Sequence, residues 1–298
     1  MITLAEKLIT GSKPTEGLEV SGYVEFVSST PMSIRPVYTN PGVTLLYSLN
    51  GTTWEPILSG RATPYANIIY FIGSATGTKS LYYNDVSSNA WYFRDATNLE
   101  CNGKLDRLLQ DNLGGDNDIL TIGDYCFCYM FFQVPSLIKA PKLPATTLSK
   151  QCYMMMFKEC VKLTIAPELP ATTVAAYCYY DMFRGCTSIT TAPKLPATTV
   201  ALGCYYGMLQ DCRNLTTPVA LPATTLAESC YYDMFRGCTS IKVSTTETGI
   251  YDTAYRIPTS GMGTTASSAL TFMFAYTGGT FTGTPTINTT YYTENTPV

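Results

Sequence analysis

The chain has 298 residues, a formal net charge of −3 and only 14% charged side chains. Such a weak, slightly acidic balance argues against nucleic acid as a partner, because that binding depends on a basic surface. No apolar run is long enough to span a bilayer, and the residues from Met1 to Lys7 do not form a secretory signal, so we expect neither membrane insertion nor export.

The first segment, residues 1–19, contains Gly11, Pro14 and Gly17 and few side chains that form a core. A segment of this kind commonly orders only when it docks on a partner. We expect an anchoring arm that fastens the chain to other proteins of a larger assembly, in a homo-oligomer arranged around a symmetry axis. The apolar residues available for docking are Ile2, Leu4, Leu8 and Ile9.

Residues 20–100 carry the pattern of β-strands. Val24 and Phe26 alternate with polar neighbours, and the apolar run 43–49 leads into Asn50-Gly51, a dipeptide typical of tight hairpins. Further strands are expected at 68–72, 80–83 and 91–94. Short strands separated by turns at intervals of about 8 to 12 residues predict a small antiparallel β-sandwich.

Residues 101–125 interrupt the strand pattern and predict a helical cap for the end of the repeats that follow. Four leucines would share one helical face there: Leu105, Leu108, Leu109 and Leu113. Asp116, Asp118 and Asp124 come next in a glycine-rich stretch. Their spacing fits no established calcium loop, so a solvated turn is favoured over a calcium site.

Residues 126–245 contain a repeat of 26 residues. The sequence Leu-Pro-Ala-Thr-Thr begins at Leu143, Leu169, Leu195 and Leu221, and each copy is followed by two cysteines that are eight residues apart. A fixed period of this length predicts a solenoid, because one unit cannot bury its own apolar face and must stack on its neighbours.

One helix and one strand are expected in each unit. Thr172 or Thr173 as N-cap and Gly185 as the C-terminal stop predict a helix of about three turns over 174–184. The residues after Gly185 predict a short strand that ends at Pro193. The residues expected in the core are Cys152, Cys160, Cys178, Met182, Phe183, Cys186, Cys204, Cys212, Cys230 and Cys238.

The eleven cysteines are expected to be buried thiols. Two cysteines eight residues apart in one helix would be separated by about 12 Å, and equivalent cysteines of packed helices by about 8–10 Å, which is too far for a disulfide. The chain has no histidine and the spacing is not that of a zinc knuckle, so a zinc site is the weaker alternative.

Residues 246–298 are expected to hold a degenerate last repeat and a C-terminal cap. In the segment 269–277, alanine and threonine stand where cysteines would be. The segment 278–298 is rich in Gly, Thr and Tyr and predicts short strands that cover the end of the repeats.

Two segments carry a resemblance to a known family. Residues 182–189 read Met-Phe-Arg-Gly-Cys-Thr-Ser-Ile and residues 195–199 read Leu-Pro-Ala-Thr-Thr. This pattern resembles the BspA-type leucine-rich repeats of gut Bacteroidetes and of the phages that infect them, over roughly residues 100 to 298. The resemblance implies a leucine-rich-repeat solenoid for attachment or display, without chemistry of its own. The expected fold is therefore mainly β with short helices: an N-terminal antiparallel β-sandwich, then a short α/β solenoid with capping ends.

A column of outward-facing residues is the candidate ligand site. If the repeats are helical, each tyrosine shares an outer face with a side chain four residues later, which could lie over the ring. The alternative, which the sequence favours, is that the tyrosines fill grooves between helices while the basic residues complement helix C-termini. The residues of the column are Tyr180, Arg184, Tyr206, Gln210, Tyr232 and Arg236.

We expect no enzymatic activity and no cofactor or metal, because the chain lacks histidine and no pair of carboxylates recurs in the repeats. The preferred hypothesis is a bacteriophage virion protein made in the host cytoplasm, such as a fibre, tail-tip or capsid-decoration component. Its partners would be other virion proteins, through the arm, and a glycan or protein of the host surface. The alternatives are a bacterial cell-surface adhesin of the same repeat family and, less favoured, a polysaccharide depolymerase.

Overall fold

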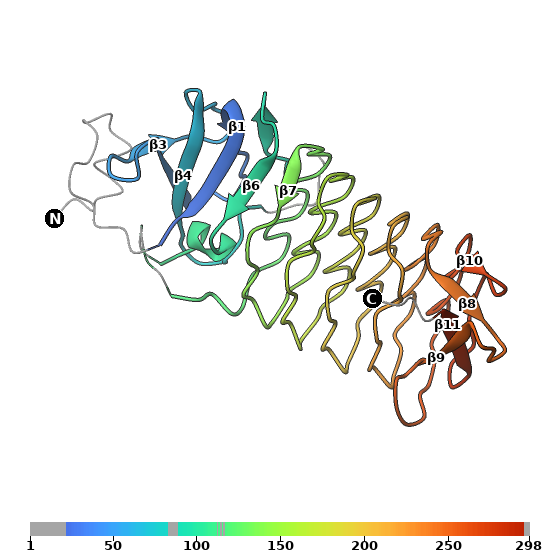
Figure 1. Cartoon of the computed structure of the whole chain (residues 1–298). Helices are drawn as coiled ribbons and strands as arrows, with labels where there is room; N and C mark the ends of the chain where they lie inside the picture. Colours follow the sequence, from blue (N-terminus) through green and yellow to red (C-terminus); the bar gives the residue numbers. More distant parts are fainter. Residues whose placement is uncertain (1–21, 83–88, 112, 114, 116, 295–298) are drawn as a thin grey trace.

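The computed structural model describes residues 22–82, 89–111, 113, 115 and 117–294 (Figure 1). The expected anchoring arm, with Ile2, Leu4, Leu8 and Ile9, and also Asp116, lie outside the described residues. The described chain is mainly β, as expected, with very little helix, which includes the 3₁₀ helix η2 (Leu105–Leu108). Within these residues no helix has the length and apolar character needed to cross a membrane.

The N-terminal strands form a seven-stranded sheet with the order β3-β2-β4-β1-β6-β7, and β5 pairs with β1 outside this order. The hairpin predicted at Asn50-Gly51 is confirmed, since β2 and β3 pair antiparallel on either side of it. A sandwich requires two facing sheets, whereas the described strands of this region belong to one. The strands are β1 (Val24–Arg35), β2 (Val43–Ser48), β3 (Glu55–Ile57), β4 (Ala66–Ala75), β5 (Tyr92–Arg94), β6 (Leu99–Asn102) and β7 (Leu137–Lys139).

The helix expected in the cap is shorter than the spacing of its leucines predicts. Leu105, Leu108 and Leu109 are fully buried, as the apolar face predicts. The helix stops after Leu108, because the backbone of Leu109 leaves the helical region. Leu113 packs instead against the separate small cluster that contains Trp54.

Beyond β7 the chain winds into coils that stack side by side along one axis (Figure 1). Each coil contains ten residues of overlapping turns, which we call a turn segment. The turn segments are residues 125–134, 151–160, 177–186, 203–212, 229–238 and 268–277.

Backbone hydrogen bonds alternate along a turn segment. The N–H of Tyr180 donates to the carbonyl of Tyr177 in the same coil (3.2 Å), whereas the N–H of Tyr179 donates to the carbonyl of Cys204 in the next coil (2.9 Å). Every second residue therefore joins neighbouring coils, as residues do in a β-ladder. An α-helix bonds each N–H to the carbonyl four residues earlier. The helix predicted over 174–184 is thus wrong, and a string of turns replaces it.

A positive φ at every fourth residue explains the turns. In the segment 177–186 it occurs at Tyr177 (57°), Asp181 (50°) and Gly185 (74°). A right-handed helix cannot contain this conformation, whereas the third position of a type II turn requires it. Glycine and aspartate tolerate it better than most residues. The equivalent positions of the next two copies are Gly203, Gly207, Asp211, Ser229, Asp233 and Gly237.

The strand expected after Gly185 is also not formed. Where Leu-Pro-Ala-Thr-Thr segments of adjacent coils meet, the structure has isolated parallel bridges, Thr147 with Thr173 and Thr199 with Thr225. A proline stands in each segment and has no N–H to donate, so a continuous parallel ladder cannot extend through it.

Stacked aromatic rings fill the interior of the coils. Phe157 stacks on Phe131 at 5.4 Å and on Phe183 at 5.6 Å, with nearly parallel planes. Phe93 of β5 stacks on Phe131 at 5.5 Å, so the N-terminal sheet and the coils share one core. A second buried column, which the sequence analysis did not identify, consists of Phe127, Tyr153, Tyr179, Tyr205 and Tyr231.

All eleven cysteines are buried and free. Eight of them, from Cys152 to Cys238, are among the ten residues predicted for the core of the repeats. Met182 and Phe183 are fully buried beside them. The thiol of Cys186 donates to the carbonyl of Phe157 in the preceding coil at 3.0 Å, and the contact recurs at Cys160, Cys212 and Cys238. The cysteines therefore act as small apolar residues that also satisfy a backbone acceptor.

Equivalent cysteines of neighbouring coils lie closer together than the sequence predicted. Coils joined by β-type hydrogen bonds lie about 4.7–4.9 Å apart, not the 8–10 Å of packed helices, so equivalent Cα atoms fall inside the usual disulfide range. Parallel side chains keep their Cβ atoms at about the same spacing, whereas a disulfide needs a mean of about 3.8 Å. The thiols are thus kept apart by the register of the coils.

A four-stranded sheet with the order β10-β8-β11-β9 covers the far end of the coils (Figure 1). The last coil continues the interior, since Phe274 stacks on Phe235 at 5.6 Å. Thr277 stands where earlier copies have cysteine, and its hydroxyl donates to the Phe274 carbonyl at 2.8 Å. The strands are β8 (Lys242–Ser244), β9 (Tyr251–Arg256), β10 (Gly278–Gly279) and β11 (Thr290–Glu294).

Candidate binding surface

Tyr180, Tyr206 and Tyr232 form a continuous column on the outside of three successive coils. The ring centroids of Tyr180 and Tyr206 are 4.8 Å apart, and those of Tyr206 and Tyr232 are 4.6 Å apart, with nearly parallel planes. Phe272 of the last coil closes the column edge-on at 5.8 Å from Tyr232. Since the rings cover each other's faces, the column presents ring edges and hydroxyl groups to solvent.

The three hydroxyls of this column have no hydrogen-bond partner among the described residues. Burial of the rings raises the pKa of Tyr180, and it raises the pKa of Tyr206 to about 12, with the neighbouring tyrosines and aspartates adding to the effect. The phenols of Tyr180 and Tyr206 therefore stay protonated at neutral pH. Each can donate one hydrogen bond and accept others, and the hydroxyls recur at the spacing of the coils.

The arginines of the expected column do not lie over these tyrosines. Arg184 pairs with Asp181 (Nη1 to Oδ2, 3.2 Å), and Arg236 pairs with Asp233 at 3.4 Å. The guanidinium of Arg236 lies over the ring of Tyr276, at 5.2 Å, and not over Tyr232. The expectation was wrong because a four-residue offset is one helical turn, and the chain here is not helical.

Buried aspartates anchor the basic side chains. Asp181 is 1% exposed, and its Oδ2 also accepts a hydrogen bond from Lys158 of the preceding coil at 3.0 Å. Burial raises the pKa of Asp233, and the nearby Arg236 partly offsets this. Arg184 and Arg236 therefore hold buried carboxylates in place.

Gln210 is not available as a contact residue either. Its side chain is buried, since Gln210 is only 7% exposed. Of the six residues predicted for this site, the structure thus leaves the three tyrosines as candidates to touch a ligand. One signal in the sequence indicates the true role of the arginines: in both clean copies, an aspartate stands three residues before the arginine, at Asp181 and Asp233.

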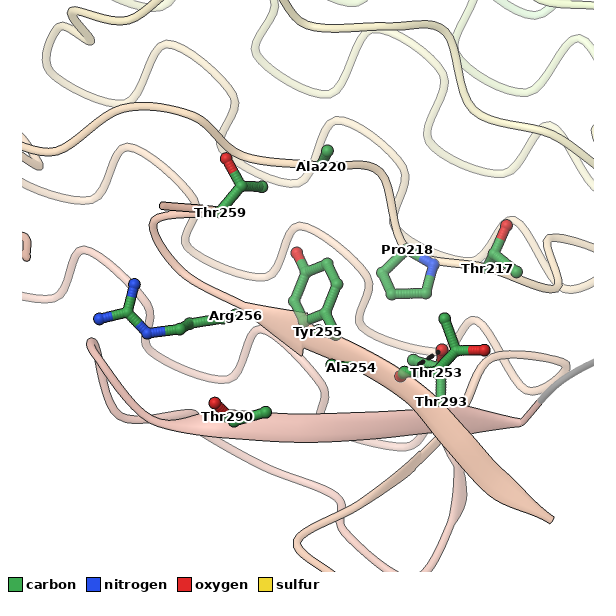
Figure 2. Close-up of a pocket in the computed structure, with 10 residues that line it drawn as sticks. All are labelled: Thr217, Pro218, Ala220, Thr253, Ala254, Tyr255, Arg256, Thr259, Thr290 and Thr293. Carbon is green, nitrogen blue, oxygen red and sulfur yellow. Dashed lines mark hydrogen bonds between the residues drawn. The ribbon is translucent and has the colours of Figure 1, made fainter. Parts of the chain in front are cut away.

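A separate cleft of about 440 Å³ lies at the C-terminal end, between the sheet strands β9 and β11 and the segment 217–220 (Figure 2). The side chains of Arg256 and Tyr255, its strongest polar groups, are already hydrogen-bonded within the protein. Arg256 donates to the carbonyls of Pro258 and Gly261 at 3.0 and 2.6 Å. The hydroxyl of Tyr255 donates to the carbonyl of Val219 at 3.2 Å. The cleft therefore offers threonine side chains more than directed charge.

In the part of the chain that the structure describes, no three Cys, Asp or Glu side chains are grouped so that they could hold a metal ion. Asp118 pairs with Lys104 and with Arg107, and Asp124 accepts a hydrogen bond from the backbone N–H of Lys150 at 3.0 Å. Asp118 is thus held by basic side chains, and Asp124 joins the backbone at the start of the next coil.

No family model, no curated protein and no solved structure matches this chain. The resemblance to BspA-type repeats therefore depends on the residues of the repeat alone, and the function has to be argued from geometry.

Proposed function

We propose that this chain is a non-enzymatic structural protein of a bacteriophage virion, a fibre, tail-tip or capsid-decoration component, whose repeats form a solenoid for attachment to the host surface. The observation that carries the proposal is the column of Tyr180, Tyr206 and Tyr232. It repeats, at a nearly constant spacing, a hydroxyl that has no hydrogen-bond partner in the described part of the chain. Tyrosine is enriched at recognition surfaces because it combines apolar area with a polar group.

The coils supply a rigid support for this column. Adjacent coils are joined by backbone hydrogen bonds at every second residue of the turn segments. The buried phenylalanines and tyrosines stack through the interior, and a sheet lies at each end. Capped ends are what a solenoid requires, so the lateral faces stay free for display. We place the repeats with the leucine-rich class, with the turn segment in place of the helix.

A polymer that repeats its own hydrogen-bonding groups is the ligand that fits this column best. A single hydrogen bond to one of the three hydroxyls is weak, so a ligand that binds all three at once gains most in affinity. A surface polysaccharide of the host has this character. We therefore propose a host-surface glycan as the ligand of the tyrosine column.

Replacing Tyr180, Tyr206 and Tyr232 together with phenylalanine tests this proposal. The substitutions keep the stacked rings and remove only the hydroxyls. With about 0.5–1.5 kcal/mol for each net hydrogen bond, binding should weaken by at least about tenfold. Labelled protein is incubated with bacteria that bind the wild type, and bound label is measured by flow cytometry. Tyr23→Phe, at an exposed position directly before strand β1, is the matched control. Unchanged binding of the triple variant would refute the role of the column.

The anchoring role of the arm is tested by deletion of residues 1–19. The truncated chain should remain folded by circular dichroism but should no longer be incorporated into particles. Normal assembly of the truncated chain would contradict the arm as the point of attachment, and it would leave the tyrosine column untouched.

A further inference from the structure

The N-terminal sheet places two arginines at diagonal positions of a strand pair, on the same face. Strands β1 and β5 pair antiparallel, with Ser33 opposite Arg94 and Arg35 opposite Tyr92. Between these pairs Ile34 faces Phe93, and both pack into the core. Because alternate residues of a strand point to opposite faces, Arg35, Tyr92 and Arg94 all emerge on the other side.

These side chains line a cleft of about 430 Å³, together with Ser33 and Ala62. The guanidinium of Arg35 lies over the ring of Tyr92, with its Cζ 3.8 Å from the ring centroid. Stacking fixes the plane of the guanidinium and leaves its N–H groups free at the edge. The hydroxyl of Ser33 already donates to the carbonyl of Thr63 at 2.6 Å, so the arginines are the charged donors of the cleft.

Neither arginine has a carboxylate partner among the described residues. By contrast, Arg107, Arg184 and Arg236 each form an ion pair with an aspartate. Asp95 follows Arg94 in the chain but accepts a hydrogen bond from the hydroxyl of Tyr65 at 2.8 Å and does not line the cleft; Arg94 also interacts with this hydroxyl, which is neutral. In a chain with a net charge of −3, two neighbouring positive charges thus face a cleft whose described lining contains no acidic residue.

We propose that Arg35 and Arg94 form a binding site for an oxyanion, the carboxylate or phosphate group of a ligand, with Tyr92 positioning Arg35. Guanidinium groups bind such anions through paired, charge-assisted hydrogen bonds. An anion between the two arginines would also relieve the repulsion of their like charges. The site lies on the N-terminal sheet and does not depend on the function assigned to the tyrosine column.

Isothermal titration of the full chain with inorganic phosphate, galacturonate and galactose tests the site. Phosphate or galacturonate should bind saturably and more weakly at high salt, while neutral galactose should not bind. The tighter of the two anions identifies the source of the oxyanion. Arg35→Gln and Arg94→Gln should each weaken binding by about tenfold, and the double variant should abolish it. Arg213→Gln, at an exposed arginine of the coils, should bind like the wild type.

Two further variants separate positioning from charge. Tyr92→Phe keeps the ring under Arg35 and should bind like the wild type, whereas Tyr92→Leu removes the ring and should weaken binding several-fold. Thermal melting confirms that each variant is folded. The proposal is overturned if neither anion binds, or if the folded double arginine variant binds as tightly as the wild type.

Discussion

Substitution of Gly207 by alanine should destabilise the chain far more than its small size suggests. Gly207 has a φ of 56°, and a Cβ at this position would overlap Oδ1 of Asp181, which leans over it from the preceding coil. Asp181 is buried and holds both Lys158 and Arg184. An alanine must therefore adopt a left-handed conformation and also displace a buried carboxylate.

The expected loss follows from these two contributions. A left-handed conformation costs an alanine about 1–2 kcal/mol. Displacing Asp181 weakens its hydrogen bond to the partly buried Lys158, a contact worth about 1.5–3 kcal/mol, while the more exposed pair with Arg184 adds less because solvent screens it. The free energy of unfolding should therefore fall by roughly 3–5 kcal/mol.

Gly60→Ala provides the matched control. Gly60 also has a positive φ, 77°, but a Cβ there would meet nothing within 4 Å. Urea unfolding followed by circular dichroism should show a loss of about 1–2 kcal/mol for Gly60→Ala, from backbone conformation alone. In an Asp181→Ala background, the excess cost of Gly207→Ala should disappear. Equal losses for the two glycine variants in the wild-type background would refute the inferred contact between Asp181 and Gly207.

Three further predictions follow from the interior. Phe183→Ala should lower the free energy of unfolding by about 3–5 kcal/mol, because it opens a cavity in a stacked column, and a loss under about 1 kcal/mol would contradict the packing. A thiol reagent should leave the native protein unlabelled at pH 8 and titrate eleven thiols after denaturation without reductant; two or more disulfides would contradict the register of the coils. Burial raises the pKa of Cys186, Cys230 and Cys238 to about 12. Above about pH 9 the unfolded chain therefore releases protons that the folded chain retains, and stability to urea should fall from pH 9 to pH 11. Constant stability over this range would argue against buried thiols.

Local chemistry made part of the fold predictable. The Asn50-Gly51 hairpin depends on two residues with a strong turn preference, and the structure forms it between β2 and β3. The burial of Met182 and Phe183 follows from apolar residues that recur in register. The number of sheets formed by the N-terminal strands was harder to foresee, because it depends on pairings between residues far apart in the chain, such as β6 with β7.

The helix was mispredicted because its apolar pattern is ambiguous. Cys178, Met182 and Cys186 are spaced by four, which approximates one helical face but also fits a string of four-residue turns. The distinguishing signal lies in the positions between them. Glycine and aspartate interchange between copies, as at Asp181 and Gly207, and they share a tolerance for positive φ, not a helical preference.

The candidate site was only partly visible for the same reason. The outward position of Tyr180, Tyr206 and Tyr232 was predicted from helical phase, and the repeat placed one tyrosine in each copy. Their mutual stacking requires coils that lie as close as β-strands. The assignment of Arg184 to the same column depended on helical phase. In the turn segment, Arg184 donates a hydrogen bond to Asp181, three residues earlier.

Fractionation of cells that produce this chain tests the proposed function most directly. Particles, cell envelope and cytosol are separated, and peptides of the chain are quantified in each by mass spectrometry. A virion protein should be concentrated in purified particles, at a constant ratio to the other particle proteins. Peptides concentrated in the cell envelope and missing from the particles would contradict the proposal and favour a cell-surface adhesin.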